Sequence, residues 1–368
     1  MLITLIAGAR PNFMKIAPLI KAIQKANSEG KNIHYRLVHT GQHYDRNMSD
    51  TFFSELGIPM PDVNLGCGGG TQAEQTAAIM VAFEKELQQH PSDLVLVVGD
   101  VTSTMACSIV AKKLNTKVTH VEAGIRSWDL TMPEEINRMV TDCLADFYFT
   151  TSEVANQNLR QMGVSESRIH FVGNVMIDTL LANKNRFKRP KIYDELQLKE
   201  KEYIVLTMHR PANVDEEQHL KSLMEQIITN VHKLPIIFPI HPRTAKIFYH
   251  LWGNEEQLKT IFPNLHIVEP MGYLEFNYLV EHSKAVITDS GGITEETTVM
   301  GIPCITLRDN TERPETCTIG TNELIGTDPK NIKPALDKLF AGEWKIGAIP
   351  PLWDGNAAKR IIEVLGKM

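Results

Sequence analysis

The sequence predicts an α/β protein made of two doubly wound domains separated by a cleft. Short apolar runs alternate with amphipathic stretches along almost the whole chain, which is typical of βαβ units and parallel sheets. The 368 residues exceed what one hydrophobic core usually supports. A charged, proline-containing stretch with little apolar periodicity, residues 184–202, separates two sets of such runs. Two domains, with a ligand cleft between them, are therefore expected.

The first domain is expected over residues 1–174. Its strands are short apolar runs, and its helices are longer stretches with helical periodicity. The expected strands are 2–7, 34–40, 94–98, 117–121, 147–150 and 169–172. The expected helices are 14–28, 72–89, 103–114, 134–144 and 153–162. The last strand ends in Phe171-Val172-Gly173-Asn174, and we set the boundary there.

The second domain is expected over residues 175–352 and repeats the alternation of strands and helices. The expected strands are 203–208, 235–240, 265–268, 284–288 and 303–307. The expected helices are 215–232, 273–282, 291–300 and 330–340. The proline-rich piece Ala348–Pro351 interrupts the chain before a last helix, 355–367. We expect this C-terminal segment, 353–368, to pack back on the first domain.

Composition and charge exclude several classes of protein. A net charge of −6 and a pI near 6.1 argue against a nucleic-acid or anionic-membrane surface, because such partners select basic patches. No apolar stretch approaches the ~18–20 residues of a membrane-spanning helix. The first residues lack a basic region and a cleavage site, so they predict a strand and not a signal peptide. Five scattered cysteines without C-x-x-C spacing indicate a reducing compartment, and we expect a cytoplasmic protein.

Polar residues follow most of the expected strands, at the sheet edge where open α/β sheets bind ligands. They are Arg10, Asn12, Lys15, Gln42, His43, Asp100, Glu122, Arg126, His209, Arg210, His241, Arg243, Asp289 and Ser290. Turns and helix caps are also polar, and Asp100 and Ser290 stand where an N-cap residue belongs. Capping does not explain the neighbouring arginines, histidines and glutamates.

The stretch Asp289–Glu296 runs from a buried strand into a helix through Ser290, Gly291 and Gly292. Glycines let a ligand approach the backbone, and free N–H groups at a helix N-terminus suit a phosphate. Glu296 is placed to reach the hydroxyls of a ribose, although most helical glutamates are simply solvated. Arg313 follows the next strand and is a candidate for the diphosphate.

The candidates for acid/base chemistry are Asp100, Glu122, Glu134 and His209. Glu134 lies in a proline-initiated first helical turn, where an i,i+4 ion pair with Arg138 is an equally ordinary explanation.

The spacing of residues in the sequence excludes several other types of site. The glycines around 66–70 do not follow a strand, as a dinucleotide fingerprint requires, and neither a Walker A sequence nor a nucleophile elbow is present. We therefore expect no nicotinamide cofactor. We also expect no metal, because no metal-ligand spacing occurs.

Taken together, the motifs resemble those of the non-hydrolysing UDP-N-acetylglucosamine 2-epimerases, over almost the full length. The matching segments, in chain order, are Gly8-Ala9-Arg10-Pro11 with Lys15, Gly41-Gln42-His43, Gly99-Asp100, Val121–Arg126, Pro133-Glu134-Glu135 with Arg138, Gly173-Asn174, His209-Arg210, Asp289–Glu296 and Thr311–Glu315. This resemblance implies two Rossmann-like domains in the GT-B arrangement. It also implies interconversion of UDP-GlcNAc and UDP-ManNAc, no cofactor, and a homodimer.

The resemblance implies roles for individual residues. Asp100, Glu122 and Glu134 become the proton-transfer candidates, and His209 stabilises the leaving group or phosphate. UDP is expected to contact Arg10, Lys15, His241, Ser290, Gly291, Gly292, Glu296 and Arg313. Because the sugar C2 hydrogen is weakly acidic and no dinucleotide fingerprint is present, elimination of UDP to a glycal followed by re-addition is the favoured route.

Two departures from the family pattern keep the sugar open. Met271 stands where many members have glutamine, and Thr294 replaces another common glutamine. The alternatives are a different UDP-N-acetyl sugar of the diacetamido uronic acid or fucosamine type, a hydrolysing epimerase, a GT-B glycosyltransferase and a non-catalytic UDP-sugar sensor. The segment after His43 differs from the one that bacterial members use for an activating UDP-GlcNAc, so allosteric activation is not implied.

Overall fold

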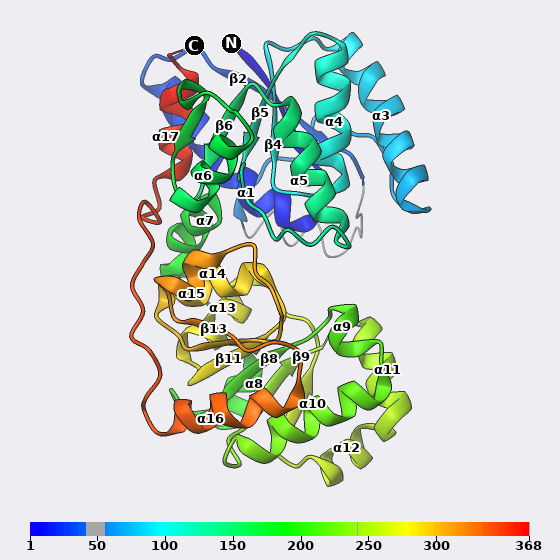
Figure 1. Cartoon of the computed structure of the whole chain (residues 1–368), viewed down its shortest axis with the longest axis vertical. Helices are drawn as coiled ribbons and strands as arrows, with labels where there is room; N and C mark the ends of the chain where they lie inside the picture. The colour runs from blue at the N-terminus through cyan, green and yellow to red at the C-terminus, as the bar shows by residue number, and fades with distance from the viewer. Residues whose placement is uncertain (42–55, 241, 368) are drawn as a thin grey trace. The chain divides into compact units, whose positions relative to one another are not determined.

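The computed structural model describes residues 1–41, 56–240 and 242–367, and it divides into two compact units (Figure 1). Unit 1 contains Met1–Asn183 and Pro351–Met368, and unit 2 contains Lys184–Pro350. The first unit thus extends past the boundary expected near 174. The reason is helix α7, Val175–Asn183, which packs on α1, Arg10–Ser28; the Thr179 hydroxyl donates to the carbonyl of Met14 at 2.5 Å.

The sheet of unit 1 has, within the described residues, seven parallel strands in the order β3-β2-β1-β4-β5-β6-β7. Their bounds are β1 Leu2–Ala7, β2 His34–His39, β3 Val63–Asn64, β4 Leu94–Val98, β5 Lys117–Val121, β6 Phe147–Thr150 and β7 Ile169–Phe171. All are close to the predicted strands except β3, which was not predicted. Strand β4, with the sequence LVLVV, is buried along its whole length, as expected of a strand covered on both faces.

The helices of unit 1 form two groups (Figure 1). Helices α1, α7 and α17 pack together, and α4 packs against both α3 and α5. The remaining bounds are α3 Gln72–Gln89, α4 Thr102–Lys113, α5 Pro133–Leu144, α6 Glu153–Gln161, α17 Ala357–Leu365 and the 3₁₀ turn Glu166–Arg168. Helix α3 begins where Thr71 and Glu74 form a reciprocal capping box.

Unit 2 is built around a parallel sheet of six described strands in the order β10-β9-β8-β11-β12-β13. Their bounds are β8 Ile204–Thr207, β9 Ile236–Pro239, β10 Leu265–Val268, β11 Ala285–Thr288, β12 Cys304–Thr306 and β13 Asn322–Leu324. The last of them was not predicted. Buried apolar clusters cover both faces of the sheet, one around Phe238 and Leu336 and the other around Tyr203 and Val286.

The helices of unit 2 include several that the sequence analysis missed. The bounds are α8 Lys191–Glu195, α9 Pro211–Val214, α10 Glu217–Asn230, α11 Pro242–Trp252, α12 Glu255–Ile261, α13 Tyr273–His282, α14 Gly291–Met300, α15 Pro314–Thr318 and α16 Ile332–Phe340, with 3₁₀ turns at Lys184–Arg186 and Pro329–Asn331. Helices α8, α9, α11, α12 and α15 were not predicted, nor was α7 in unit 1. Among the described residues, no helix is long and apolar enough to cross a membrane.

The C-terminal segment returns to unit 1. The Trp353 side chain is buried, and its Nε1–H donates to the carbonyl of Thr151 at 3.0 Å. Asp178 on α7 accepts the first backbone N–H groups of α17, from Ala357 at 3.0 Å and Ala358 at 2.7 Å. Capping and packing therefore fix α17 on α1 and α7.

Each sheet has one point where the strand order reverses. In unit 1 it lies between β1 and β4, and in unit 2 between β8 and β11. Ligands of doubly wound sheets bind beyond the carboxyl ends of the strands at such a point. The predicted polar residues that follow these four strands therefore lie where a ligand is expected.

Candidate active site

Glu122 lies directly after β5 and forms a buried ion pair with Lys15. Its Oε2 is 2.6 Å from the Lys15 Nζ, and the side chains are only 2% and 11% exposed. The Glu122 backbone has φ = 70°, a conformation that a residue with a side chain rarely adopts. Such strain is common at functional sites.

Gly99, which directly follows β4, makes room for this pair. A Cβ at Gly99 would lie 2.8 Å from the Lys15 Nζ and 3.7 Å from the Glu122 Oε2. Its φ of 66° also disfavours any side chain. The close approach of β4 to the ion pair therefore requires glycine.

Asp100, the next residue, is held by Arg138 from helix α5. The Asp100 Oδ2 accepts from Arg138 Nε at 3.0 Å and from Nη2 at 2.5 Å, and its side chain is 30% exposed. The N-cap of α4 is Val101, without a side-chain cap, so Asp100 does not have the capping role considered above. The carboxylate is instead oriented by a guanidinium while part of it faces solvent.

Arg138 also pairs with Glu135, and not with Glu134 as the i,i+4 spacing suggested. Its Nη1 is 2.7 Å from the Glu135 Oε2. Glu135 is fully buried and accepts the backbone N–H groups of Ser127 and Trp128, at 3.0 and 3.1 Å. Glu134 is exposed in the first turn of α5. The helix thus uses its second glutamate for structure and leaves the first facing solvent.

A buried histidine links the loops that carry Asp100 and Glu122. The His120 Nε2 lies 2.8 Å from the carbonyl of Gly99, and its Nδ1 lies 2.6 Å from Asp142. Asp142 also accepts from the backbone of Gly124 at 3.0 Å and pairs with Arg126 at 2.7 Å. Burial favours a higher pKa for Asp142, but His120 and Arg126 hold that pKa below its usual value.

In unit 2, His209 follows β8 and contacts Asp289, which follows β11. The His209 Nδ1 is 3.0 Å from the Asp289 Oδ1; the His209 side chain is 52% exposed, and that of Asp289 is fully buried. The Asp289 carboxylate also accepts from the backbone N–H of Arg210 at 2.9 Å and from the Asn213 side chain at 3.1 Å. Asp289 therefore fixes the turn that presents His209.

Ser290, Gly291 and Gly292 form the N-terminus of α14. Ser290 is the N-cap residue, but its side chain makes no capping hydrogen bond, so the capping explanation for Ser290 does not hold. A Cβ at Gly292 would meet nothing within 4 Å. A Cβ at Gly291 would instead lie 3.2 Å from the Glu312 Oε1 and 3.7 Å from the Arg308 Nη1. An uncapped helix start with open space beside Gly292 is suited to an anion.

Glu296 is buried in α14 and is not a solvated helical carboxylate. Its Oε1 accepts from the Tyr273 hydroxyl at 2.9 Å. Burial raises its pKa from the ordinary value to about 7. Arg313, also buried, donates through Nε to Glu295, and Arg308 pairs with Glu312 at 2.7 Å. The side chains expected to bind a nucleotide are thus largely held inside unit 2.

Five of the predicted residues cannot be placed in this way. Gln42, His43 and His241 lie outside the described residues, as do the side chains of Arg10 and Arg243, whose backbones lie in α1 and α11. The sequence analysis did not single out His120, Glu135 or Asp142, although Glu135 belongs to a matched motif.

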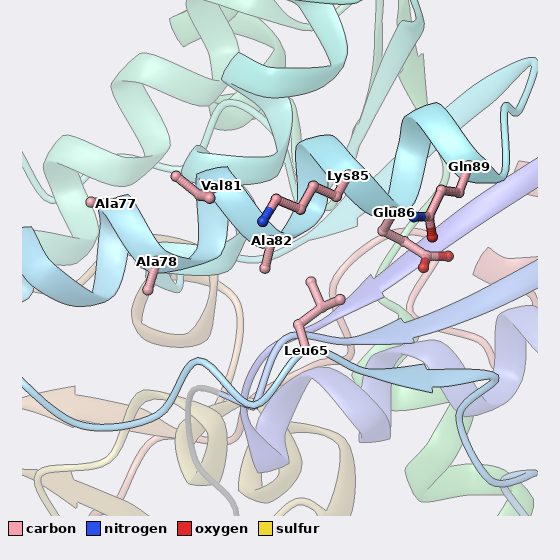
Figure 2. Close-up of a pocket in the computed structure, with 8 residues that line it drawn as sticks. All are labelled: Leu65, Ala77, Ala78, Val81, Ala82, Lys85, Glu86 and Gln89. Atoms are coloured by element: carbon pink, nitrogen blue, oxygen red, sulfur yellow. The ribbon is translucent and has the colours of Figure 1, made fainter.

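A groove on unit 1 contains none of the predicted residues (Figure 2). It has a volume of about 570 Å³ and lies along α3, where its lining includes Ala78, Val81 and Ala82; Ala82 points toward Leu65. The charged residues of its lining are Lys85 and Glu86, and Glu86 is paired with Arg36, so we do not place the active site there. Among the described residues, no group of three or more His, Cys, Asp and Glu side chains is arranged to hold a metal ion.

Comparisons with known proteins agree with the sequence motifs. The family model for UDP-N-acetylglucosamine 2-epimerase matches residues 25–366. A Methanocaldococcus jannaschii protein of that name is 39% identical and covers 99% of both chains. A Pseudomonas aeruginosa relative named UDP-2,3-diacetamido-2,3-dideoxy-D-glucuronate 2-epimerase is 36% identical and covers 100% of both chains.

Solved structures agree with this assignment. The crystal structure of the M. jannaschii UDP-GlcNAc 2-epimerase in complex with UDP-GlcNAc and UDP superposes with a TM-score of 0.88, at 38% identity and with 100% of both chains covered. The predicted two-domain α/β fold and the predicted family are both confirmed. The chain belongs to the UDP-N-acetylglucosamine 2-epimerase family.

Proposed function

We propose that this protein is a UDP-N-acetylglucosamine 2-epimerase that interconverts UDP-GlcNAc and UDP-ManNAc. The observation that carries the proposal is the pair of carboxylates at neighbouring strand ends of unit 1, each held by a cation. Glu122 is paired with Lys15, and Asp100 with Arg138. Carboxylates oriented in this way are suited to move a proton to and from a bound substrate.

The proposed reaction is an elimination followed by an addition. A base takes the proton from sugar C2, the C–H electron pair forms the C1=C2 double bond, and UDP leaves C1 with the electrons of the C1–O bond. The product is a 2-acetamidoglycal and UDP. UDP then attacks C1 again while C2 receives a proton on the opposite face, which inverts that centre.

Asp100, Glu122 and Glu134 are the groups proposed to transfer these protons. Two of them must act on opposite faces of the sugar, one as base and one as acid. The ion pair with Lys15 fixes the Glu122 carboxylate, so we assign Lys15 an orienting role beside its expected contact with UDP.

The residues of unit 2 are proposed to bind UDP. The Ser290 hydroxyl and the N–H groups of Gly291 and Gly292 suit the diphosphate, because the helix start is uncapped. Glu296 is proposed to accept from a ribose hydroxyl, and Arg313 to contact the nucleotide. His209 stabilises the departing diphosphate, and Arg10 and His241 complete the expected set.

A second substrate is favoured by one observation. The relative named for UDP-2,3-diacetamido-2,3-dideoxy-D-glucuronate is 36% identical over the full chain, close to the 39% of the relatives named for UDP-GlcNAc. The reaction at C2 would be the same, and only contacts at C3 and C6 would change. Comparing kcat/KM for the two UDP-sugars decides between them.

We also propose that the enzyme acts in the cytoplasm as a homodimer. The free cysteines, three of them buried, fit a reducing compartment. Light scattering coupled to size-exclusion chromatography tests the dimer; a monomer mass at micromolar concentration would contradict it.

The central test is proton NMR of UDP-GlcNAc with the purified protein in D2O, without any acceptor. We expect UDP-ManNAc carrying deuterium at C2. Release of UDP with free ManNAc would indicate a hydrolysing enzyme instead. Binding of UDP without exchange or turnover of either UDP-sugar would refute the epimerase assignment.

Substitutions separate the two groups of residues. Asp100→Asn, Glu122→Gln and Glu134→Gln should nearly abolish turnover while UDP still binds, because each keeps the shape of the side chain but cannot take up the proton. Arg313→Ala should weaken UDP binding, measured by calorimetry. Turnover at wild-type rates in all three carboxylate variants would contradict the mechanism.

A further inference from the structure

We infer that Asp289 is a positioning residue that controls which ring nitrogen of His209 faces the substrate. The inference rests on the proposed function for its effect on turnover, but its structural part does not depend on that function. Asp289 is fully buried and directly follows β11; His209 lies just beyond β8, the neighbouring strand.

The contact is specific for one nitrogen. The Asp289 Oδ1 lies 3.0 Å from the His209 Nδ1. An ionised carboxylate only accepts hydrogen bonds, so the His209 Nδ1 must carry the proton. Burial favours a higher pKa for Asp289, but the hydrogen bond and charge of His209 and the N–H groups of Arg210 and His209 hold it below its usual value. The carboxylate is therefore ionised near neutral pH.

The consequence concerns Nε2, the other ring nitrogen. With Nδ1 committed to Asp289, Nε2 is the nitrogen that the half-exposed ring offers to a ligand. When the ring is protonated, Nε2–H can donate to the phosphate oxygen of departing UDP, and the buried carboxylate stabilises the imidazolium. A buried carboxylate has this effect on histidine in other enzymes.

Asp289 also has a structural role that the test must separate. Its carboxylate accepts the backbone N–H groups of His209 and Arg210, both within 3.2 Å, and the side-chain amide of Asn213. An asparagine at 289 keeps one accepting oxygen for these groups. It can present its NH2 group to His209, however, which favours the opposite tautomer. Asp289→Asn therefore changes which ring nitrogen of His209 carries the proton, with little change in the hydrogen bonds that hold the turn.

The first experiment is long-range ¹H–¹⁵N NMR of the full chain labelled with ¹⁵N-histidine, at a pH where the ring is neutral. His209→Gln assigns the signal. We expect a protonated Nδ1 in the wild type and a protonated Nε2 in Asp289→Asn. An unprotonated Nδ1 in the wild type overturns the inference even if the variant does not fold, and so does the same tautomer in both proteins.

The second experiment is a double-mutant cycle on turnover. Asp289→Asn should lower kcat by about 10-fold, because the neutral Nε2–H can still donate but the imidazolium, which donates the stronger hydrogen bond, loses the carboxylate that stabilises it. In a His209→Gln background it should cause no further loss, because Asp289 acts through His209. A further loss of similar size would show a merely structural role and overturn the inference.

Asp178→Asn is the matched control, because Asp178 is also a buried carboxylate that accepts two backbone N–H groups. It should leave the His209 tautomer and kcat unchanged. If the wild type turns over neither UDP-sugar, the proposed function fails, while the NMR experiment still decides whether Asp289 controls the ring.

Discussion

Replacing Arg138 by alanine tests the arrangement that holds Asp100. Arg138 is 2% exposed and pairs with two carboxylates, Asp100 and Glu135. Its removal leaves the fully buried Glu135 without a cation, which costs about 3–5 kcal/mol for a typical buried pair. We expect the lower end, about 3 kcal/mol, because Glu135 keeps its hydrogen bonds from Ser127 and Trp128 and because Asp100 is 30% exposed.

The assay is thermal unfolding followed by circular dichroism. A loss of this size corresponds to a midpoint lower by about 6–12 °C for a domain of 150–250 residues. Turnover should also fall, since Asp100 loses its orientation. Adding Glu135→Gln to Arg138→Ala should restore much of the midpoint, because it removes the uncompensated buried charge.

Arg160→Ala provides the matched control. Arg160 also bridges two carboxylates, Glu153 and Glu166, but on the surface. Exposed pairs contribute little, so its midpoint should scarcely change. If Arg138→Ala lowers the midpoint no more than Arg160→Ala does, the buried ion pairs do not hold this site together.

Three further predictions follow from the site. Glu122→Gln should lower kcat by about 10²–10⁴-fold, the usual contribution of one acid/base group, while the affinity for UDP, measured by calorimetry, stays unchanged. An equal loss of kcat and of UDP affinity would contradict a proton-transfer role. Gly99→Ala places a methyl group 2.8 Å from the Lys15 Nζ at φ = 66°, so it should reduce both kcat and the unfolding midpoint. Gly30→Ala, also at a positive φ (91°) but in open space, should reduce only the midpoint. Burial raises the Glu296 pKa to about 7, so the folded state binds more protons than the unfolded state and stability falls as pH rises from about 4.5 to 7. Glu296→Gln should remove the part of this loss of stability that Glu296 causes, measured as the unfolding midpoint between pH 4.5 and 8. If the midpoints of the wild type and the variant change in parallel with pH, Glu296 does not have the raised pKa.

Length explains part of the difference between predicted and missed elements, although the 11-residue helix α11 was also missed. Strands such as β4 and helices such as α3 have five or more residues with a clear apolar pattern. Strand β3 has two residues and helix α9 has four, too few for a pattern to be detected. Helix α7 is different, because it is buried on nearly all sides and so lacks the polar face that marks an amphipathic helix.

The residues of the candidate site also divide into those that the sequence could identify and those that it could not. Asp100, Glu122 and His209 could be identified because each follows a predicted strand. The partners could not: Arg138 is 38 residues from Asp100, and Asp289 is 80 residues from His209, so only the folded sheets bring them together. The sequence also could not decide between Glu134 and Glu135, because a rotation of one residue around α5 exchanges the buried and the exposed carboxylate.

The return of residues 351–368 to unit 1 has a consequence for biosynthesis. Helix α17 contributes a buried apolar face to unit 1, formed by Ala357, Ala358, Ile361, Ile362 and Leu365. The ribosome makes it only after Lys184–Pro350, which at typical rates takes roughly 10–30 s. During that interval the surfaces of α1 and α7 that α17 will cover remain exposed, while unit 2, which is one continuous stretch, can complete its fold. The unit that begins first on the ribosome is therefore the one that finishes last.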